Sequence, residues 1–458
     1  MNTILLLAPL LLQVLTSGHH LPGSVPPIGP VKQPNVLLIL VDDLGVEHVD
    51  FHPVGRAAGN PAPTPYLDSL ASQAVIYTQF YATPICSASR ASRLTGRYPF
   101  RHGVGGKIAV GEHTLPRKEV TIAEQVRQVG YRTGAFGKWH VSYDRENPRD
   151  QGFEHYDGCI LNLGAGGGDG YYDWLRVCDG QAWMESRYAT SATTDAAKAW
   201  IQERNAAPDP WFAYVAYHAP HSPHDPPPAY LNPITQASAG DSNLVIYHGM
   251  IEALDREIER LMRVVDLTDT LVIFVGDNGS PNGVVQGPVL PGKAKHTAFE
   301  GGILVPAFVT GAGVNQDHGD YEGPVHIVDL FDTILDYTGA PHVPAKVAKV
   351  DSVSLYDRTL PVDVRWIPLR QTMFTERFGP NGTGPLGPYT FLWRAARDGR
   401  YKVLRTLGGD RLFDLQVDPW EKVNLLKVPL SPAMNKEYQA LTAVIDDLTW
   451  GKGKVYGN

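Results

Sequence analysis

The sequence predicts an α/β fold, in which helices flank a large, central, mostly parallel mixed sheet and a small antiparallel α+β subdomain follows. Three observations lead to this prediction. Four continuous apolar runs have the length of strands, helical patterns lie between them, and the pattern changes to that of a β-hairpin near the C-terminus. The chain has 458 residues, of which 43% are hydrophobic, which is ample apolar material for a packed core.

The four apolar runs are continuous rather than alternating, as expected for strands that are buried on both faces of a sheet. Each run leads into a polar cluster. The runs are 36–41 before Asp42-Asp43, 133–136 before Gly137-Lys138-Trp139-His140, 211–217 before His218-Ala219-Pro220-His221, and 271–275 before Gly276-Asp277-Asn278-Gly279. Because ligands of α/β folds gather at the carboxyl ends of strands, we expect the four clusters to converge on one site.

Helices are predicted over 120–129, which Gly130 would end, and over 250–265, where apolar residues form one stripe. Near the C-terminus, 392–404 predicts a hairpin with a primed turn at Asp398-Gly399, followed by a strand over 411–415 and a closing helix over 432–448. We therefore expect a catalytic domain over 35–345 and a C-terminal subdomain over 346–458.

The charge and the N-terminus limit the partners. The chain has 40 Lys and Arg against 48 Asp and Glu, a net charge of −8, and no long basic run, so neither nucleic acid nor an anionic membrane is expected. The apolar stretch 3–16 is shorter than the ~20 residues that span a bilayer, and it predicts a signal peptide over 1–18. The alternative is a buried N-terminal helix or strand. We expect an exported protein without a membrane span, with a Pro- and Gly-rich linker over 19–34.

Three cysteines are an odd number for an exported protein. If Cys86 is reactive or modified, Cys159 and Cys178 remain and can form a disulfide, although their spacing does not fix the distance between them. Two sequons for N-glycosylation, at Asn278 and Asn381, are also present.

Asp42, Asp43, Asp277 and Asn278 offer only oxygen ligands, which suits Ca²⁺ or Mg²⁺ rather than zinc. Pairs of this kind are more often turn or cap residues, but an unpaired carboxylate after a buried strand would be costly. The spacing of His218, His221 and His224 resembles that of zinc ligands. The intervening prolines disfavour a helix, so His218 and His224 are more simply loop or substrate-contact residues.

Cys86 is predicted to begin a helix, where free backbone N–H groups favour an anion and lower the pKa of a thiol. Arg90, one helical turn later, can point back at the same place. The residues therefore indicate a nucleophile at an oxyanion-binding helix end. The alternative is a small buried cysteine.

The segment Cys86-Ser87-Ala88-Ser89-Arg90, followed by Leu94-Thr95-Gly96-Arg97, resembles the signature of the type I sulfatases of the alkaline-phosphatase-like superfamily. In that family the cysteine of Cys-x-Pro-x-Arg or Cys-x-Ala-x-Arg is oxidised to formylglycine. The resemblance covers nearly the whole chain after the signal. It continues through the four strand-end clusters, Lys295 before Glu300-Gly301-Gly302, and Arg411-Leu412-Phe413-Asp414-Leu415.

The resemblance implies a role for each matching residue. The cation, Ca²⁺ or Mg²⁺, would bind Asp42, Asp43, Asp277, Asn278 and the modified Cys86. Arg90 and Lys138 would hold the hydrate and the sulfate, and His140 would take a proton to help expel sulfate. His221 and Lys295 would contact the sulfate and assist the leaving alcohol, with His218 as a further substrate contact. Lys293 competes with Lys295 for its role.

The resemblance implies a sulfatase that acts on a sulfated carbohydrate in the periplasm, outside the cell or in a lysosome, after a formylglycine-generating enzyme has converted Cys86. Two alternatives are a phosphonate monoester or phosphodiester hydrolase with the same modified cysteine, and a catalytically silent glycan-binding relative. Four aromatic residues near a Gly-rich insertion could stack on sugar rings or pack against the domain: Tyr171, Tyr172, Trp174 and Trp183.

Overall fold

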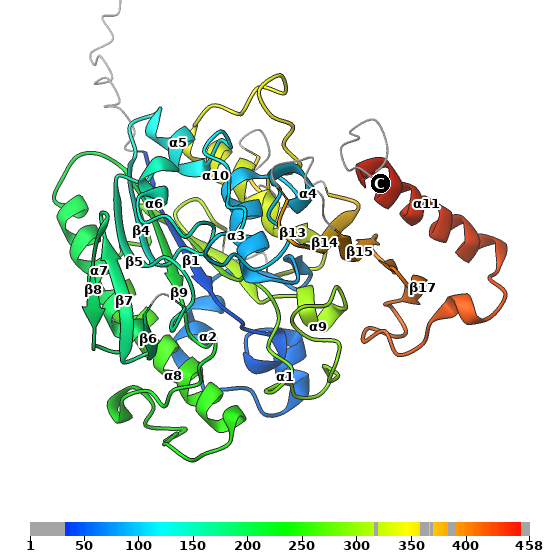
Figure 1. Ribbon diagram of the computed structural model, residues 1–458, viewed down its shortest axis with the longest axis horizontal. Helices are drawn as coiled ribbons and strands as arrows, with labels where there is room; N and C mark the ends of the chain where they lie inside the picture. Colours follow the sequence, from blue (N-terminus) through cyan, green and yellow to red (C-terminus); the bar gives the residue numbers. More distant parts are fainter. Residues whose placement is uncertain are drawn as a thin grey trace, which may run out of the picture. The chain divides into compact units, whose positions relative to one another are not determined.

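The computed structural model describes residues 33–449 except 166, 316–318, 358–365, 367–369 and 383–389, and residues 34–458 form one compact unit. The described part contains a mixed sheet with the strand order β12-β2-β11-β10-β1-β9-β4-β5-β7-β6, and β8 pairs with β7 (Figure 1). Its strands are β1 (Asn35–Val41), β2 (Val75–Tyr77), β4 (Arg132–Lys138), β5 (His155–Cys159), β6 (Gly168–Gly170), β7 (Asp173–Cys178), β8 (Gln181–Glu185), β9 (Trp211–Tyr217), β10 (Thr270–Gly276), β11 (Ala307–Gly311) and β12 (Asp320–Tyr321).

The central strands of this sheet, β10, β1, β9, β4 and β5, are parallel to one another, whereas β11 and β7 join them in antiparallel register. β1 shows why its sequence is continuously apolar. Val36, Leu38 and Leu40 pack into the core on one face of the sheet, and the intervening Leu37, Ile39 and Val41 pack into the core on the other. The four strands expected from apolar runs are thus present, each followed by its polar cluster.

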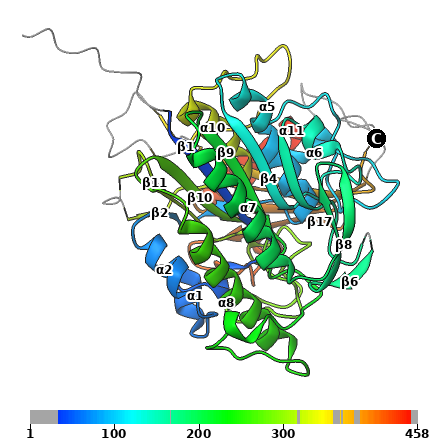
Figure 2. The same cartoon turned by 90° about the vertical axis from the view of Figure 1, so that its left-hand side faces the viewer.

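Helices cover both faces of the sheet (Figures 1 and 2). One core includes side chains of α3 (Cys86–Thr95), α5 (Ile122–Arg127) and α10 (Leu330–Thr338), and the other includes α2 (Pro65–Ala71), α7 (Ala189–Asn205) and α8 (Asn243–Met262). α5 begins at a capping box of Thr121 and Glu124. The shorter elements are α1 (Pro53–Ala58), α4 (Pro99–His102), α6 (Asn147–Asp150), α9 (Glu300–Ile303) and the 3₁₀ turns η1 (Val46–His48), η2 (Ala229–Leu231), η4 (Ile327–Asp329) and η5 (Leu425–Lys427).

The C-terminal part forms an antiparallel sheet in the order β14-β15-β16-β17, with α11 packed against it. Its elements are β14 (Met373–Gly379), β15 (Thr390–Arg397), β16 (Tyr401–Thr406), β17 (Gly409–Asp414) and α11 (Pro432–Thr449); a separate two-stranded sheet pairs β3 (Phe80–Tyr81) with β13 (Val325–His326). The predicted hairpin is present, but the primed turn was wrong, because neither Asp398 nor Gly399 has positive φ. Instead, the Asp398 carboxylate accepts hydrogen bonds from the backbone N–H groups of Arg400 and Tyr401, at 2.7 and 2.6 Å.

The predicted signal peptide and nearly all of the linker lie outside the described residues. The described helices include none with the length and apolar character needed to cross a bilayer. The boundary expected near residue 345 stays a prediction, because the two sheets belong to one compact unit.

Candidate active site

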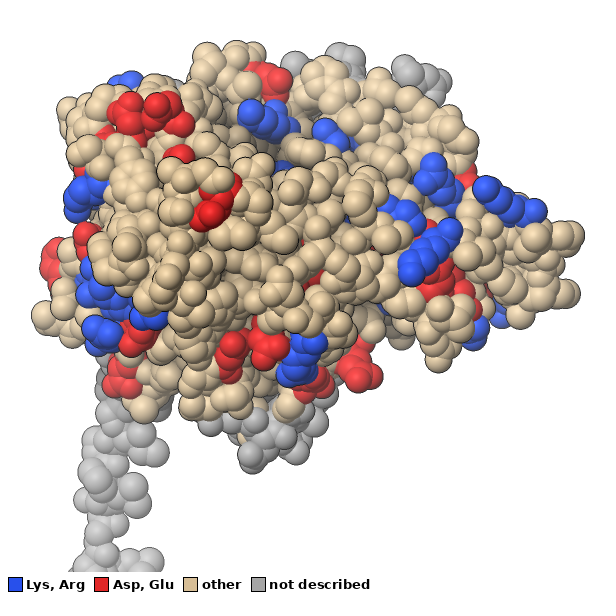
Figure 3. All heavy atoms as spheres, turned by 90° about the horizontal axis from the view of Figure 1, so that it is seen from below, with Lys and Arg blue, Asp and Glu red and all other residues tan. Residues whose placement is uncertain are grey.

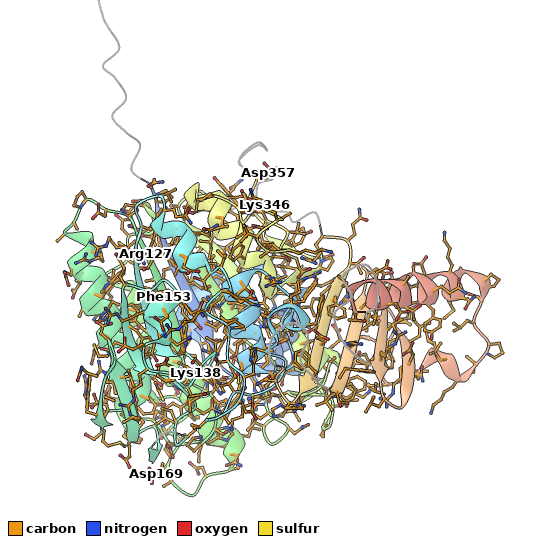
Figure 4. The ribbon with its side chains drawn as sticks, turned by 45° about the horizontal axis from the view of Figure 1, so that its top comes forward. Arg127, Lys138, Phe153, Asp169, Lys346 and Asp357 are labelled. Atoms are coloured by element: carbon orange, nitrogen blue, oxygen red, sulfur yellow. The ribbon has the colours of Figure 1, made fainter. Side chains whose placement is uncertain are left out.

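Polar side chains from four parallel strands meet at the carboxyl ends of those strands. On the face of the molecule seen in Figure 3, acidic and basic side chains are interspersed. Asp43 follows β1 and Asp277 follows β10, and the backbone N–H of Asp43 donates to Asp277 Oδ1 at 3.1 Å. Lys138 ends β4 and forms an ion pair with Asp42, both fully buried, in the interior of the unit (Figure 4). His221, in the loop after β9, has its Nε2 3.8 Å from Asp43 Oδ2. The expected convergence of the four clusters is therefore present.

The acidic group can hold a cation. Asp42 Oδ1 and Asn278 Oδ1 are buried and have no hydrogen-bond partner, whereas Asn278 Nδ2 donates to Asp43 Oδ1 at 2.7 Å and leaves its own oxygen free. Ligand atoms of Asp42, Asp43 and His221 lie within 4.8 Å of one another. Burial and the neighbouring Asp42 raise the pKa of Asp277 to about 7. Crowded carboxylates with free oxygens are the donor set that a hard divalent ion satisfies.

Arg90 is buried one turn into α3, and its guanidinium binds the acidic group. Its Nε and Nη2 donate to Asp277 Oδ2 at 3.1 and 2.9 Å, and Nη1 donates to the carbonyl of Lys138 at 2.8 Å. Arg90 Nη2 also lies 3.3 Å from Asp42 Oδ2. Arg90 therefore links α3 to the ends of β1, β4 and β10.

Cys86 begins α3, as predicted, and its Sγ lies 3.3 Å from His140 Nδ1. The other ring nitrogen of His140 lies 3.1 Å from the carbonyl of Ile108, which accepts its hydrogen and leaves Nδ1 as an acceptor. The expectation of a lowered thiol pKa was wrong. Burial raises the pKa of Cys86, and this effect outweighs the lowering by Lys138 and Lys295.

Lys295 and Lys293 are separated by the structure. Lys295 Nζ lies 2.5 Å from Asp43 Oδ1, inside the site. Lys293 Nζ instead donates to the backbone carbonyls of Trp420 and Glu421, at 3.2 and 2.5 Å. Lys293 is therefore bound to the C-terminal part of the chain, and Lys295 is the lysine next to the acidic group.

The three histidines after β9 do not gather their ring nitrogens into one group, so the zinc alternative is wrong. His221 Nδ1 donates to the carbonyl of Ser222 at 2.5 Å, which leaves Nε2 toward the site. His218 is buried with Nε2 3.4 Å from the carbonyl of Leu161, and His224 packs edge-on against Tyr247. Only His221 of the three reaches the acidic group.

The aromatic residues near the insertion divide into two kinds. Tyr171 and Trp174 are 0% and 2% exposed, so packing against the domain is the correct interpretation for them. The Tyr171 hydroxyl donates to the carbonyl of His221 at 2.9 Å and holds that loop in place. Tyr172 and Trp183 are 41% and 42% exposed and stay available to a ligand.

Cys159 and Cys178 are free thiols, so the possible disulfide is not formed. The two residues lie on neighbouring antiparallel strands, but β5 and β7 pair Cys178 with Asp157, two residues before Cys159. This register sets the cysteines diagonally instead of opposite each other.

The asparagines of both sequons have structural roles in the folded protein. Asn278 is in the acidic group, and Asn381 is 8% exposed with its amide fully engaged. Asn381 Oδ1 accepts from the N–H groups of Gly105 and Gly106 at 3.0 and 2.7 Å, and Nδ2 donates to the carbonyl of Lys107 at 3.2 Å. Neither amide is free to be glycosylated in the folded protein.

Several contributors to the site were missed by sequence reasoning. Tyr247, on α8, donates its hydroxyl to the carbonyl of Asp43 at 2.6 Å, and Tyr214, on β9, accepts from Arg90 at 3.3 Å. Asp43 and His140 have φ of 66° and 57°, which non-glycine residues adopt rarely and mostly where surrounding contacts hold them. A tyrosine within an apolar strand or helix gives no signal of such a contact.

The sulfatase family model matches residues 34–340 of this chain. The chain is 30% identical over 330 residues to arylsulfatase J of Mus musculus, a match that covers 66% of this chain and 52% of the relative. It is 29% identical over 358 residues to N-acetylgalactosamine-6-sulfatase of Canis lupus familiaris, covering 68% of this chain and 63% of the relative. The chain thus spans between about half and two thirds of the length of these relatives.

Solved structures show the same fold. One is Ps i-CgsB in complex with k-i-k-neocarrahexaose, with a TM-score of 0.76 and 23% identity over 92% of this chain and 93% of that one. Another, solved in complex with its substrate D-glucosamine-2-N,6-O-disulfate, has a TM-score of 0.70 and 17% identity over 91% of this chain and 97% of that one. The α/β fold class predicted from the sequence is confirmed.

Proposed function

Because this chain belongs to the sulfatase family, we propose that it hydrolyses sulfate monoesters and that its substrate is a sulfated carbohydrate. The observation that carries the proposal is the position of Cys86. It begins α3 with its Sγ 3.3 Å from His140 Nδ1, and Lys138 and Lys295 lie close enough to influence the pKa of its thiol. An anionic ester needs such cations around its approaching nucleophile.

The proposed site also needs a modified residue and a metal ion. Residue 86 as hydrated formylglycine would supply an oxygen nucleophile for the sulfur and would release sulfate by returning to the aldehyde. A bound Ca²⁺ or Mg²⁺, held by Asp42, Asp43, Asp277 and Asn278, would neutralise charge on the sulfate oxygens. The unpartnered oxygens of Asp42 and Asn278 support this ligand set.

The side chains of this protein have separate tasks in the proposal. His140 Nδ1 is free to accept a proton at residue 86, because the carbonyl of Ile108 holds the opposite ring nitrogen. Lys138 and Lys295 orient the sulfate by their charge. Arg90 positions the acidic group and the start of α3, since its hydrogen bonds are given to Asp277 and to the Lys138 carbonyl.

His221 and Lys295 lie on the side of Asp43 and are placed to assist the departing alcohol. His221 Nε2 is unprotonated when Nδ1 donates to Ser222, so in this state it orients the alcohol; to donate a proton it must first gain one. Lys295 carries a charge that Asp43 stabilises at 2.5 Å. Together they can stabilise the negative charge that develops on the leaving oxygen.

The carbohydrate part of the proposal rests on the relatives. One curated relative is named for N-acetylgalactosamine 6-sulfate chemistry, and two structures of the same fold contain saccharides. We further propose that the protein is exported through its apolar N-terminal segment and that a formylglycine-generating enzyme converts Cys86. His218 is the remaining expected substrate contact.

The test combines mass spectrometry with kinetics. The peptide that contains Cys86, from protein co-expressed with a maturation enzyme, should have the mass of formylglycine, and the protein should cleave an aryl sulfate faster than the matching phosphate and phosphonate esters. A screen of defined sulfated saccharides then identifies the substrate. Converted protein that prefers the phosphonate ester would favour the phosphonate hydrolase instead, and an unconverted thiol without turnover would favour the glycan-binding relative.

A further inference from the structure

Three segments meet beside the proposed reacting centre: the loop 103–108 after α4, the loop that begins at Lys295, and the end of β14. Asn381 fastens the first to the third, since its amide binds Gly105, Gly106 and the carbonyl of Lys107. Arg377, on β14, joins the third segment to the second, because its Nη1 donates to the carbonyl of His296 at 2.6 Å. The first segment carries Lys107, the second His296 and the third Arg377, and of these Lys107 and Arg377 carry the positive charge.

The same segments are also fastened to the surroundings of Cys86. The carbonyl of Ile108, next to Lys107, lies 3.1 Å from His140 Nε2, and the Ile108 N–H donates to Ser87 Oγ at 3.1 Å. His296 follows Lys295 directly, and its N–H donates to the carbonyl of Pro84 at 2.9 Å. Loop 103–108 and the loop at His296 therefore contact groups that surround Cys86, and Arg377 is bound to the second of these loops.

No carboxylate of the described residues pairs with Lys107 or Arg377, and the undescribed segment 383–389 contains no acidic residue. Arg377 Nε is buried and has no hydrogen-bond partner. Burial, together with Lys295, Arg377 and Lys107, lowers the pKa of His296 to about 4, although Asp43 opposes the shift, so His296 is uncharged at neutral pH. Asn381 Nδ2 also donates to Glu112 Oε2 at 3.1 Å, so one carboxylate lies beside loop 103–108. Lys107 and Arg377 nevertheless have no carboxylate partner among the described residues, and Arg377 keeps a buried donor that needs an acceptor.

We propose that Lys107, Arg377 and the His296 loop form a second anion subsite, which binds a further sulfate or carboxylate of the same saccharide. This inference rests on the proposed function and makes its substrate class narrower: a saccharide with at least two anionic groups. The planar guanidinium of Arg377 can bind two oxygens of one sulfate or carboxylate, while Lys107 adds a mobile charge. The subsite acts on affinity and specificity, and the chemistry of ester cleavage does not require it.

The test uses two saccharides that differ by one anionic group, glucosamine 2-N,6-O-disulfate and N-acetylglucosamine 6-O-sulfate, in which a neutral amide replaces the N-sulfate. Each is measured as an inhibitor of aryl sulfate hydrolysis and, by calorimetry, as a ligand of the Cys86→Ser protein, so that binding is seen without turnover. The variants are Arg377→Gln and Lys107→Gln. Lys107 is exposed, so its variant carries little risk to folding. Lys346→Gln is the matched control, since Lys346 is exposed and lies away from Lys138 (Figure 4).

We expect the wild-type protein to bind the disulfate at least about tenfold more tightly than the monosulfate, and each variant to lose about tenfold to a hundredfold of the disulfate affinity. Monosulfate binding and aryl sulfate turnover should stay within about twofold, and Lys346→Gln should match the wild type. Equal affinities for both saccharides in the wild type, or unchanged disulfate binding in both variants, would overturn the second subsite. Failure of aryl sulfate turnover in converted protein would instead overturn the proposed function. The calorimetric affinities of the Cys86→Ser protein would still show whether the second subsite binds an anionic group.

Discussion

At the scale of single residues, the site is built from charges that neutralise one another inside the protein. Lys138 and Arg90 face Asp42 and Asp277, and all four side chains are fully buried. Each charge would be costly alone, because burial removes its hydration. Removing one member therefore changes both the binding of an anionic substrate and the pKa of its partners.

Replacement of Lys138 by alanine should reduce kcat by about 10²–10³, as does the loss of one preorganised donor to a developing oxyanion in other enzymes. Aryl sulfate kinetics on protein with fully converted residue 86 measures this. Lys436→Ala, which removes an exposed lysine of α11, is the control and should leave kcat unchanged. Near-normal turnover of Lys138→Ala would remove this residue from the reaction.

Addition of Ca²⁺ or Mg²⁺ should stabilise the folded protein, because the cation would satisfy the free oxygens of Asp42 and Asn278. At an ion concentration about 100 times the Kd, the gain is about 2.7 kcal/mol. Thermal unfolding after chelation, with and without added ion, measures it. The response should vanish in Asp42→Asn and persist in Asp241→Asn, which changes an exposed acid. If the Tm of the wild-type protein were the same with and without added ion, this result would contradict the cation site.

At the scale of elements, the apolar runs and the residues just after them contained most of the information about the site. A strand buried on both faces has a continuous apolar sequence, so β1, β4, β9 and β10 could be found and their ends aligned. Contacts between distant segments could not be found this way. The amide of Asn381 fastens loop 103–108, and its sequence suggested only a sequon. The raised pKa of Cys86 was missed because burial depends on the whole fold.

A substitution of Gly96, which ends α3, can measure how much the contact between α3 and α10 contributes to stability. Gly96 has φ of 67°, and a methyl group added there would lie 2.7 Å from the Phe331 ring on α10. Gly96→Ala should therefore destabilise the protein by about 2–5 kcal/mol, from backbone strain and overpacking together.

Gly130→Ala is the matched control, because Gly130 has φ of 91° but open space around it. It should cost only the backbone strain of about 1–2 kcal/mol. Urea unfolding of both variants gives the difference. Equal losses would show that contact with Phe331 does not restrain the end of α3.

At the scale of the whole described unit, buried charges fasten the C-terminal sheet to the region that contains the site. Lys402, on β16, lies 2.8 Å from Glu300 at the start of α9 and 2.9 Å from Glu421. The Glu300 N–H also donates to Glu421 at 2.6 Å. Lys293, two residues before Lys295, binds backbone carbonyls next to Glu421. The C-terminal part thus helps to position a lysine of the site.

This contact should make stability depend on pH. Burial raises the pKa of Glu421 from 4.5 to about 7, although Lys402 opposes the rise. The folded protein therefore holds this proton more tightly than the unfolded chain does. The stabilisation is complete below pH 4.5 and is lost as the pH rises through 7, a change of about 3 kcal/mol.

Glu421→Gln removes this titration. Between pH 4.5 and 7, the free energy of unfolding of the wild type should therefore fall relative to that of the variant as the pH rises. Urea midpoints at several pH values measure the difference. Glu322→Gln, at an exposed glutamate, should run parallel to the wild type. A constant difference between the wild type and Glu421→Gln over this range would contradict the raised pKa.

The burial of Cys86 also sets an order of events in time. Its side chain is 2% exposed, so a second protein has no more access to the sulfur than water has. If oxidation of this residue creates the nucleophile, the modifying enzyme must meet the nascent chain before folding buries Cys86. Each molecule would then be committed, active or inert, during its own biosynthesis, and late exposure of the finished protein to that enzyme would rescue none of the inert ones.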